Sequence, residues 1–293
     1  MKNGLDKKTR ILGAIMMAAF AVSGVQASTV SVWLNDAIVP QDPLWDATHA
    51  YVEDEVGSNR IQQWDGTGTN PSFSSDTPFA YAGNNSASFA GDLLQMMDYT
   101  DGIQGTTLEL KNALTVEAWI KPASLAADGG PVFQFIVGNS QNYGLLWRED
   151  TQKLEFAYFQ AWTSQQVDFS VTAATLTDGS WHHIAATLDT SDQGAGKGVV
   201  NLYVDGVLDS THDTVDATAL NYDVGAQGSF DFWMGGDGTR SFNGLIDEVR
   251  ISDVALAVGD LADDASLVPE PATLSLFGLI GGGMLWIRRR SRG

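Results

Sequence analysis

Aromatic and amide side chains gather between residues 142 and 165, in the stretch NYGLLWREDTQKLEFAYFQAWTSQ. Aromatic faces stack on sugar rings, and amides and carboxylates hydrogen-bond sugar hydroxyls, so a groove lined in this way can hold a glycan. The candidate ligand-binding residues are Asn142, Tyr143, Trp147, Tyr158 and Trp162. The alternative for each ring is a place in the hydrophobic core. Trp162 is the strongest candidate, because the polar run after it is typical of a loop.

Glycoside hydrolysis is the enzymatic alternative, and it needs a pair of carboxylates. The acid-rich stretches are VEDEV, with Glu53, Asp54 and Glu55, and REDTQKLEF, with Glu149, Asp150 and Glu155. Neither has the Glu-x-Asp-x-(x)-Glu spacing that places acids at alternating positions of one strand. The chain also lacks a Gly-x-Ser-x-Gly elbow, a His-Glu-x-x-His motif and a phosphate-binding loop. We therefore expect a non-catalytic protein.

Two further positions bear on metal binding. His182 and His183 are adjacent in an expected strand, so their side chains point to opposite faces and cannot chelate one ion together. Without cysteine, a zinc site is not expected.

In LIDEVRI, alternation places Asp247 with Leu245 and Val249 on the face expected to turn inward. A buried carboxylate must be hydrogen-bonded, paired with a cation or bound to a metal.

Short alternating segments must position these residues. In LTVEAWI, Leu114, Val116, Ala118 and Ile120 share one face, and the runs WHHIAATLD, SFDFWMGG and GLIDEVRIS follow the same period of two. VVNLYVDGVLDS predicts a hairpin, because Asp205-Gly206 suits the positive φ angles of a two-residue turn. Residues 28–107 are expected to supply the first strands and long loops of the same domain. The pattern predicts an all-β antiparallel sandwich or jelly roll.

The two ends differ in composition from the body. Lys7, Lys8 and Arg10, an apolar run of twelve residues from Ile11 to Val22, and small residues up to Ala27 predict a secretory signal peptide over residues 1–27. At the other end, Val-Pro-Glu-Pro (Pro269, Glu270, Pro271) precedes an apolar stretch over residues 272–287 and the basic residues Arg288, Arg289 and Arg290. We expect a short transmembrane helix over 272–287, with the arginines on the cytoplasmic side.

The charge of the body is strongly negative. The chain has 16 Lys and Arg against 36 Asp and Glu, for a net charge of −20, and no cysteine. Eight of the bases but only two of the acids lie in the two end segments, so residues 28–267 carry a net charge of −26. Nucleic acid is therefore not an expected partner, and cations are. No linker divides residues 28–267, which we expect to form one domain.

Five segments in this order resemble the laminin G-like, concanavalin A-like jelly-roll family: SFAGDLLQM, LTVEAWIKP, GSWHHIAATLD, VNLYVDGVL and FNGLIDEVRISDVAL. The match covers most of residues 85–257 and implies the fold, but the family includes binding, adhesion and accessory domains. Sandwiches of this kind often hold a structural calcium ion near the final strand, which would make Asp247 a Ca²⁺ ligand. The resemblance also implies that the alternative acid pair would lie in the concave groove.

Residues 268–293 resemble a PEP-CTERM sorting signal, which implies processing by an exosortase in a Gram-negative bacterium, after signal peptidase has cut at Ala27. The expected protein is exported, transiently anchored in the inner membrane and then placed in the cell envelope or extracellular matrix. Its expected ligand is a polysaccharide. The alternatives are a structural or adhesive protein that binds a surface protein, and a glycoside hydrolase.

Processing of the tail is testable. The 16 residues from 272 to 287 would span about 24 Å as a helix, against about 30 Å for a bilayer core. We therefore expect the mature protein from its native host to lack the arginines, as measured by intact-mass spectrometry. Replacing Pro269, Glu270 and Pro271 with alanine should leave the tail attached. A mature wild-type form that still carries the arginines would contradict the sorting hypothesis.

Overall fold

The computed structural model describes the strands of one domain and several of the turns between them. The described residues are 29–33, 38–39, 51–52, 59, 61–63, 71–80, 84–90, 93–96, 107–123, 133–139, 142–148, 153–158, 166–169, 176, 178–191, 194, 196–214, 216–220, 232–236 and 240–261. The predicted signal peptide (1–27), sorting signal (268–293) and transmembrane helix (272–287) lie outside them. Within these ranges, no helix is long and apolar enough to cross a membrane.

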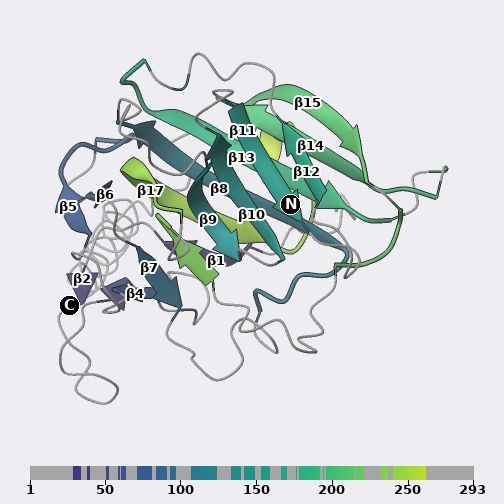
Figure 1. Cartoon of the computed structure of the whole chain (residues 1–293), viewed down its shortest axis with the longest axis horizontal. Helices are drawn as coiled ribbons and strands as arrows, with labels where there is room; N and C mark the ends of the chain where they lie inside the picture. The colour runs from purple at the N-terminus through teal and green to yellow at the C-terminus, as the bar shows by residue number, and fades with distance from the viewer. Residues whose placement is uncertain are drawn as a thin grey trace, which may run out of the picture.

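The first of two sheets, sheet A, is built around a long central strand, β17. Its strand order is β15 (Val207–Asp213), β14 (Val199–Val204), β13 (His182–Asp189), β8 (Ala113–Pro122), β17 (Asn243–Ser252), β6 (Ser86–Ala90) and β5 (Ser72–Ser74) (Figure 1). The strand β1 (Thr29–Trp33) pairs with the second half of β17, beyond the part that pairs with β6. The central strand is therefore hydrogen-bonded along both of its edges.

The second sheet, sheet B, has the order β12 (Gln166–Phe169), β11 (Lys153–Tyr158), β10 (Tyr143–Arg148), β9 (Phe133–Asn139), β16 (Phe232–Met234), β7 (Leu94–Met96), β4 (Ile61–Gln63), β3 (Tyr51–Val52) and β2 (Ile38–Val39). Every strand pairing between described residues is antiparallel. Strands from residues 29–96 enter both sheets. The structure therefore confirms the all-β antiparallel sandwich.

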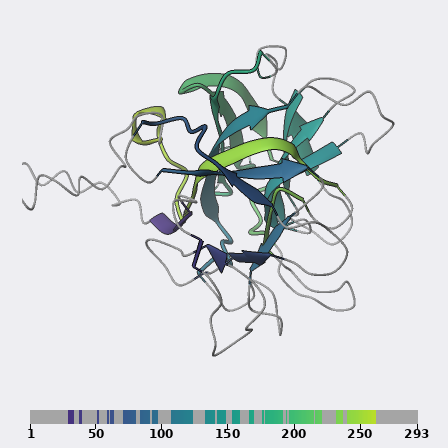
Figure 2. The same ribbon diagram turned by 90° about the vertical axis from the view of Figure 1, so that its left-hand side faces the viewer.

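Figure 2 shows the two sheets from a second side. The main hydrophobic core lies between them. Alternate residues of β8, including Leu114, Val116 and Ile120, face this core together with Tyr143 and Trp147 of β10. The other residues of β8, among them Glu117 and Trp119, lie on the opposite face of sheet A. We call this second face the sheet A outer face. The alternation that the sequence predicted for LTVEAWI is confirmed.

A β-bulge in β17 corrects the predicted position of Asp247. Before the bulge, Ile246 faces the core and Asp247 pairs with Trp119 on the sheet A outer face. The register then shifts between Asp247 and Arg250, and Glu248 has a φ of 50°. One extra residue reverses the phase of a strand. Val249 therefore faces the core, whereas Asp247, although fully buried, lies on the outer face.

The hairpin between β14 and β15 forms as the sequence predicted. Asp205 and Gly206 have φ angles of 50° and 70°, which are the two positive values of a type I′ turn. Val204 pairs with Val207 directly across this turn. The hairpin places Asp205 beside the first residues of β13.

After β17, residues 253–261 cross the sheet A outer face, and we call them the strap. Near its end, the strap forms a short 3-10 helix, Val258–Asp260. Leu256 and Leu261 pack against Ala185 and Tyr203 of the sheet. Thr115 donates a hydrogen bond to the carbonyl of Val254 and accepts one from the amide of Leu256. The strap therefore closes a second, smaller core on this side of the sandwich.

Candidate functional site

The face of sheet B that points away from the main core holds the candidate ligand site. In β10, Tyr143, Leu145 and Trp147 face the core, whereas Leu146 points to the other side. Leu146 packs there with Phe135 and Ala157, and Trp233 packs against this group while remaining partly exposed. We call this surface the sheet B outer face.

The predicted aromatic residues that the structure describes lie in the core instead. Tyr143, Trp147 and Tyr158 are at most 1% exposed, and the hydroxyl of Tyr143 donates to the carbonyl of Leu108 at 3.0 Å. This burial raises the pKa of the Tyr143 phenol. Asn142 is also buried, in the turn before β10. Their burial means that these rings are part of the hydrophobic core and not of a binding surface, because a sugar cannot stack on a ring face that solvent does not reach. Trp162 lies outside the described residues.

Trp233 is a partly exposed aromatic residue on this face that was not among the candidates from the sequence. It lies on β16, between Gly138 of β9, which has no side chain, and Gln95 of β7. Nearby, the guanidinium of Arg240 lies 5.7 Å from the centre of the Phe135 ring. The signal for Trp233 was present in SFDFWMGG, where alternation separates it from the core-facing Phe232 and Met234.

Positive charge gathers on the sheet B outer face, although the protein as a whole is acidic. Arg148 and Lys153 occupy directly opposed positions on β10 and β11, and Arg240 lies over Phe135. Arg148 also forms an ion pair with Glu155 at 3.2 Å, and the Glu155 side chain is only 2% exposed. Guanidinium and ammonium groups can bind the hydroxyl and carboxylate oxygens of a saccharide, and a partly exposed ring on the same face can stack on a sugar.

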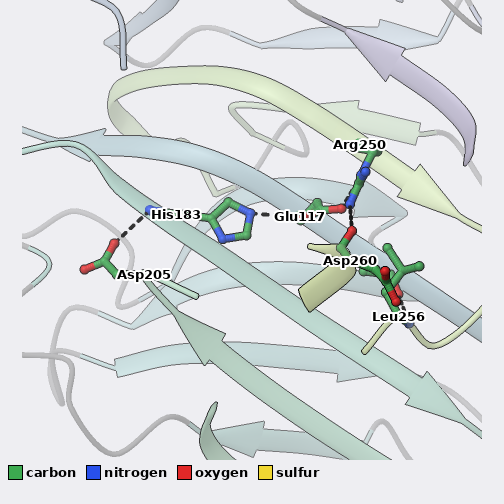
Figure 3. A network of polar contacts seen from close by, with 7 residues as sticks. Glu117, His183, Asp205, Arg250, Leu256 and Asp260 are labelled. Carbon is green, nitrogen blue, oxygen red and sulfur yellow. Dashed lines mark hydrogen bonds and ion pairs between the residues drawn. The ribbon is translucent and has the colours of Figure 1, made fainter. Parts of the chain in front are cut away.

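A buried polar network lies on the opposite sheet, below the strap (Figure 3). The carboxylate of Glu117 accepts a hydrogen bond from Nε of Arg250 and lies 3.0 Å from Nε2 of His183. Glu117 and His183 are fully buried. Arg250 also donates to the carbonyl of Asp260 at 2.7 Å, which joins the network to the strap. The charge of Glu117 is thus compensated within the protein.

His182 and His183 point to opposite faces of β13, as predicted, and Asp205 connects them. One oxygen of Asp205 accepts from the backbone amide of His183, and the other lies 2.9 Å from Nδ1 of His182. Nε2 of His182 lies 3.1 Å from Asp178. Burial alone would lower the pKa of His182, but the hydrogen bonds to Asp205 and Asp178 outweigh it and raise this pKa above 6.5. Asp178 has a lowered pKa, because it accepts from the amide of Ser180 and from His182.

The described residues do not assemble a metal site at Asp247. One of its oxygens accepts the backbone amide of Glu248 at 2.9 Å. Within the described part of the chain, no three His, Asp or Glu side chains come together in a way that could hold an ion. A calcium ion at Asp247 would need further oxygen ligands, and much of the chain between residues 34 and 106 lies outside the described residues. Calcium at Asp247 stays a prediction.

Residues 98–262 match the family model Laminin_G_3, which describes the concanavalin A-like lectin/glucanases superfamily. The matched range covers more than half of the 293 residues. It includes every strand from β8 to β17 as well as the strap. No curated protein sequence matches the chain.

Several solved structures are similar to the chain at low sequence identity. Domain 4 of AbnA, a GH43 extracellular arabinanase from Geobacillus stearothermophilus in complex with arabinotriose, is 17% identical with a TM-score of 0.47, and the match covers 80% of this chain and 96% of that one. The receptor binding domains of botulinum neurotoxin mosaic serotype C/D and of botulinum neurotoxin D are each 13% identical, with TM-scores of 0.51 and 0.50. These two matches cover 80% of this chain and 49% and 51% of theirs. The neurotoxin matches show a shared fold.

The buried network yields a stability prediction. Glu117→Gln keeps the size of the side chain but leaves Arg250 without its buried counter-charge. We expect a loss of about 3 to 5 kcal/mol in the free energy of unfolding, measured by urea denaturation. Lys197→Ala, which removes an exposed ion pair with Asp213, should change it by less than about 1 kcal/mol. Equal stabilities of the two variants would show that the Glu117 network does not stabilise the fold.

The position of His182 yields a pH prediction. Because folding raises its pKa, the stabilisation by protonated His182 is complete below pH 6.5 and is lost as the pH rises through the folded-state pKa. NMR titration should place the midpoint of His182 above 6.5. Asp205→Asn keeps the turn but removes the charge, so it should lower this midpoint. Asp213→Asn, on exposed β15, is the control and should leave it unchanged. An unaltered midpoint in Asp205→Asn would contradict the assigned cause.

Proposed function

The chain belongs to the concanavalin A-like lectin/glucanases superfamily, and on that premise we propose that it is an exported, non-catalytic protein that binds polysaccharide. The observation that carries this proposal is the partly exposed indole of Trp233 on the sheet B outer face, which packs against the group that contains Phe135, the ring under the cation of Arg240. A sugar ring stacks on the indole, and the basic side chains bind its hydroxyl or carboxylate groups.

Two carboxylates of the described sheets, Glu155 and Glu117, are unsuited to hydrolysis. A glycoside hydrolase needs one carboxylic acid that donates a proton and a second carboxylate that acts as nucleophile or base. Glu155, on the sheet B outer face, is nearly inaccessible and ion-paired with Arg148. Glu117, on the other sheet, is fully buried and engaged by Arg250 and His183. Neither is placed to reach a glycosidic bond.

The cellular placement in this proposal rests on the two ends of the sequence. The predicted signal peptide (residues 1–27) directs export, and the Pro269 to Pro271 motif marks the site at which an exosortase-type enzyme removes the tail. The resulting location is the cell envelope or extracellular matrix. Calcium at Asp247 belongs to the same proposal, and its test is a comparison of melting temperatures in millimolar Ca²⁺ and in chelator.

Glycan binding should depend on Trp233. We expect the purified 28–267 fragment to bind at least one neutral or acidic bacterial polysaccharide on a glycan array. Trp233→Ala should then weaken that binding by about fivefold or more, because one stacked ring contributes about 1 kcal/mol. Trp162→Ala tests the ring that the sequence favoured and should have a similar effect if Trp162 lines the same groove.

Val207→Ala is the matched control, because it removes an exposed apolar side chain at the distant β14–β15 turn. It should leave the affinity unchanged. Binding to a surface protein but to no glycan would favour the adhesive alternative. Release of reducing sugar from a bound polysaccharide would instead show that the protein is a hydrolase.

A further inference from the structure

A second group of partly exposed aromatic residues lies on the opposite side of the sandwich, at one end of the sheet A outer face. Its members are Phe79, Trp119 and Trp181, and we call them the sheet A aromatic patch. Trp119 lies on β8, two residues before Lys121, so both side chains share a face. Trp181 directly precedes β13, whose His182 pairs with Ile120. Trp181 therefore lies next to Lys121.

The rings of the patch are fixed by contacts within the protein. The Phe79 ring meets Trp119 edge to face, with ring centres 5.1 Å apart, and His183 lies on another side of Trp119 at 5.5 Å. Nε1 of Trp181 donates a hydrogen bond to Asp76 at 2.9 Å. His183 is itself held by Glu117. Such pre-organised rings lose little conformational entropy when a ligand binds.

Polar groups border the rings at the surface. The second oxygen of Asp76 accepts a hydrogen bond from Lys121 at 2.7 Å. The side chains of Asp76 and Lys121 remain 46% and 29% exposed. The hydrogen bonds from Lys121 and Trp181 lower the pKa of Asp76, so it stays a carboxylate well below neutral pH. Asp76 and Lys121 therefore offer an acceptor and a donor to hydroxyl groups above the rings.

The exposure of the patch suits a sugar better than a protein partner. A stable protein interface buries about 800 Å² on each side around a broad apolar centre. Within the described residues, the strongly exposed large apolar side chains are Val207, Leu208 and Val258, and none of them belongs to the patch. Separate, partly exposed rings with polar neighbours match the stacking of single pyranose rings instead.

We propose that the sheet A aromatic patch is a second carbohydrate-binding site. It lies on the other sheet from Trp233, so one molecule can hold two polysaccharide chains at once and cross-link them. The second site itself is independent of the site at Trp233, because neither set of side chains contributes to the other, whereas the cross-linking rests on both sites.

The indole N–H signals in the NMR spectrum of the 28–267 fragment test the second site directly. The probes are soluble oligosaccharides of cellulose, dextran, arabinan and alginate. We expect at least one of them to shift the Trp181 signal, in the wild type and equally in Trp233→Ala. A Trp181 signal that no probe moves at saturating concentration would overturn the proposal. If Trp181 responds and Trp233 does not, the second site stands and the Trp233 site fails.

Cross-linking provides a second readout. Light scattering should rise when the fragment is mixed with the long-chain form of a polysaccharide whose oligosaccharide shifts Trp181. Trp181→Ala should lower this rise, because the loss of one stacked ring weakens affinity at the second site by about fivefold while binding through Trp233 is retained. Trp181→Phe keeps a ring without the N–H donor and should restore part of the effect, which separates lost stacking from misfolding. Undiminished scattering by Trp181→Ala, or a patch that binds a second protein but no glycan, would contradict the proposal.

Discussion

The buried carboxylate of Glu117 is the constraint on which the arrangement of sheet A depends. A charge without water must find donors inside the protein, and Glu117 finds them on both neighbouring strands: Arg250 on β17 and His183 on β13. A one-residue slip of β8 would turn Glu117 into the apolar core and separate it from both partners. The network thus specifies the register of the three central strands. Through Arg250 and the carbonyl of Asp260, it also holds the strap in place.

The features that could be predicted from the sequence are those set by local chemistry. Strict alternation over Leu114 to Ile120 identified the core face of β8, and Asp205-Gly206 identified the tight hairpin. The position of Asp247 could not be derived, because a bulge changes the phase of a strand without a turn residue to mark it. Glu248 adopts a positive φ there although glutamate rarely does. The pairing with β8, not the local sequence, decides that conformation.

The candidate site was harder to predict because β10 of sheet B has buried apolar side chains on both of its faces. In β10, Leu145 faces the core and Leu146 the other side, and both are buried. Period-two alternation then separates the faces but does not say which one is inward. The prediction chose residues 142–165 because this stretch is rich in aromatic residues, but its described rings lie in the core. Trp233 was missed by this criterion, because it lies on a strand of only three described residues, β16.

The strap has a mechanical consequence for the domain. Any force applied to the chain after Leu261 first meets the strap, which is held by Thr115, Arg250 and the small core around Tyr203. Once the strap is pulled away, the load passes directly into β17. That strand is hydrogen-bonded to β8 on one edge and to β6 and β1 on the other, so it can leave only by shearing both ladders together. Release of the strap and shearing of β17 therefore form two successive barriers to unfolding under tension.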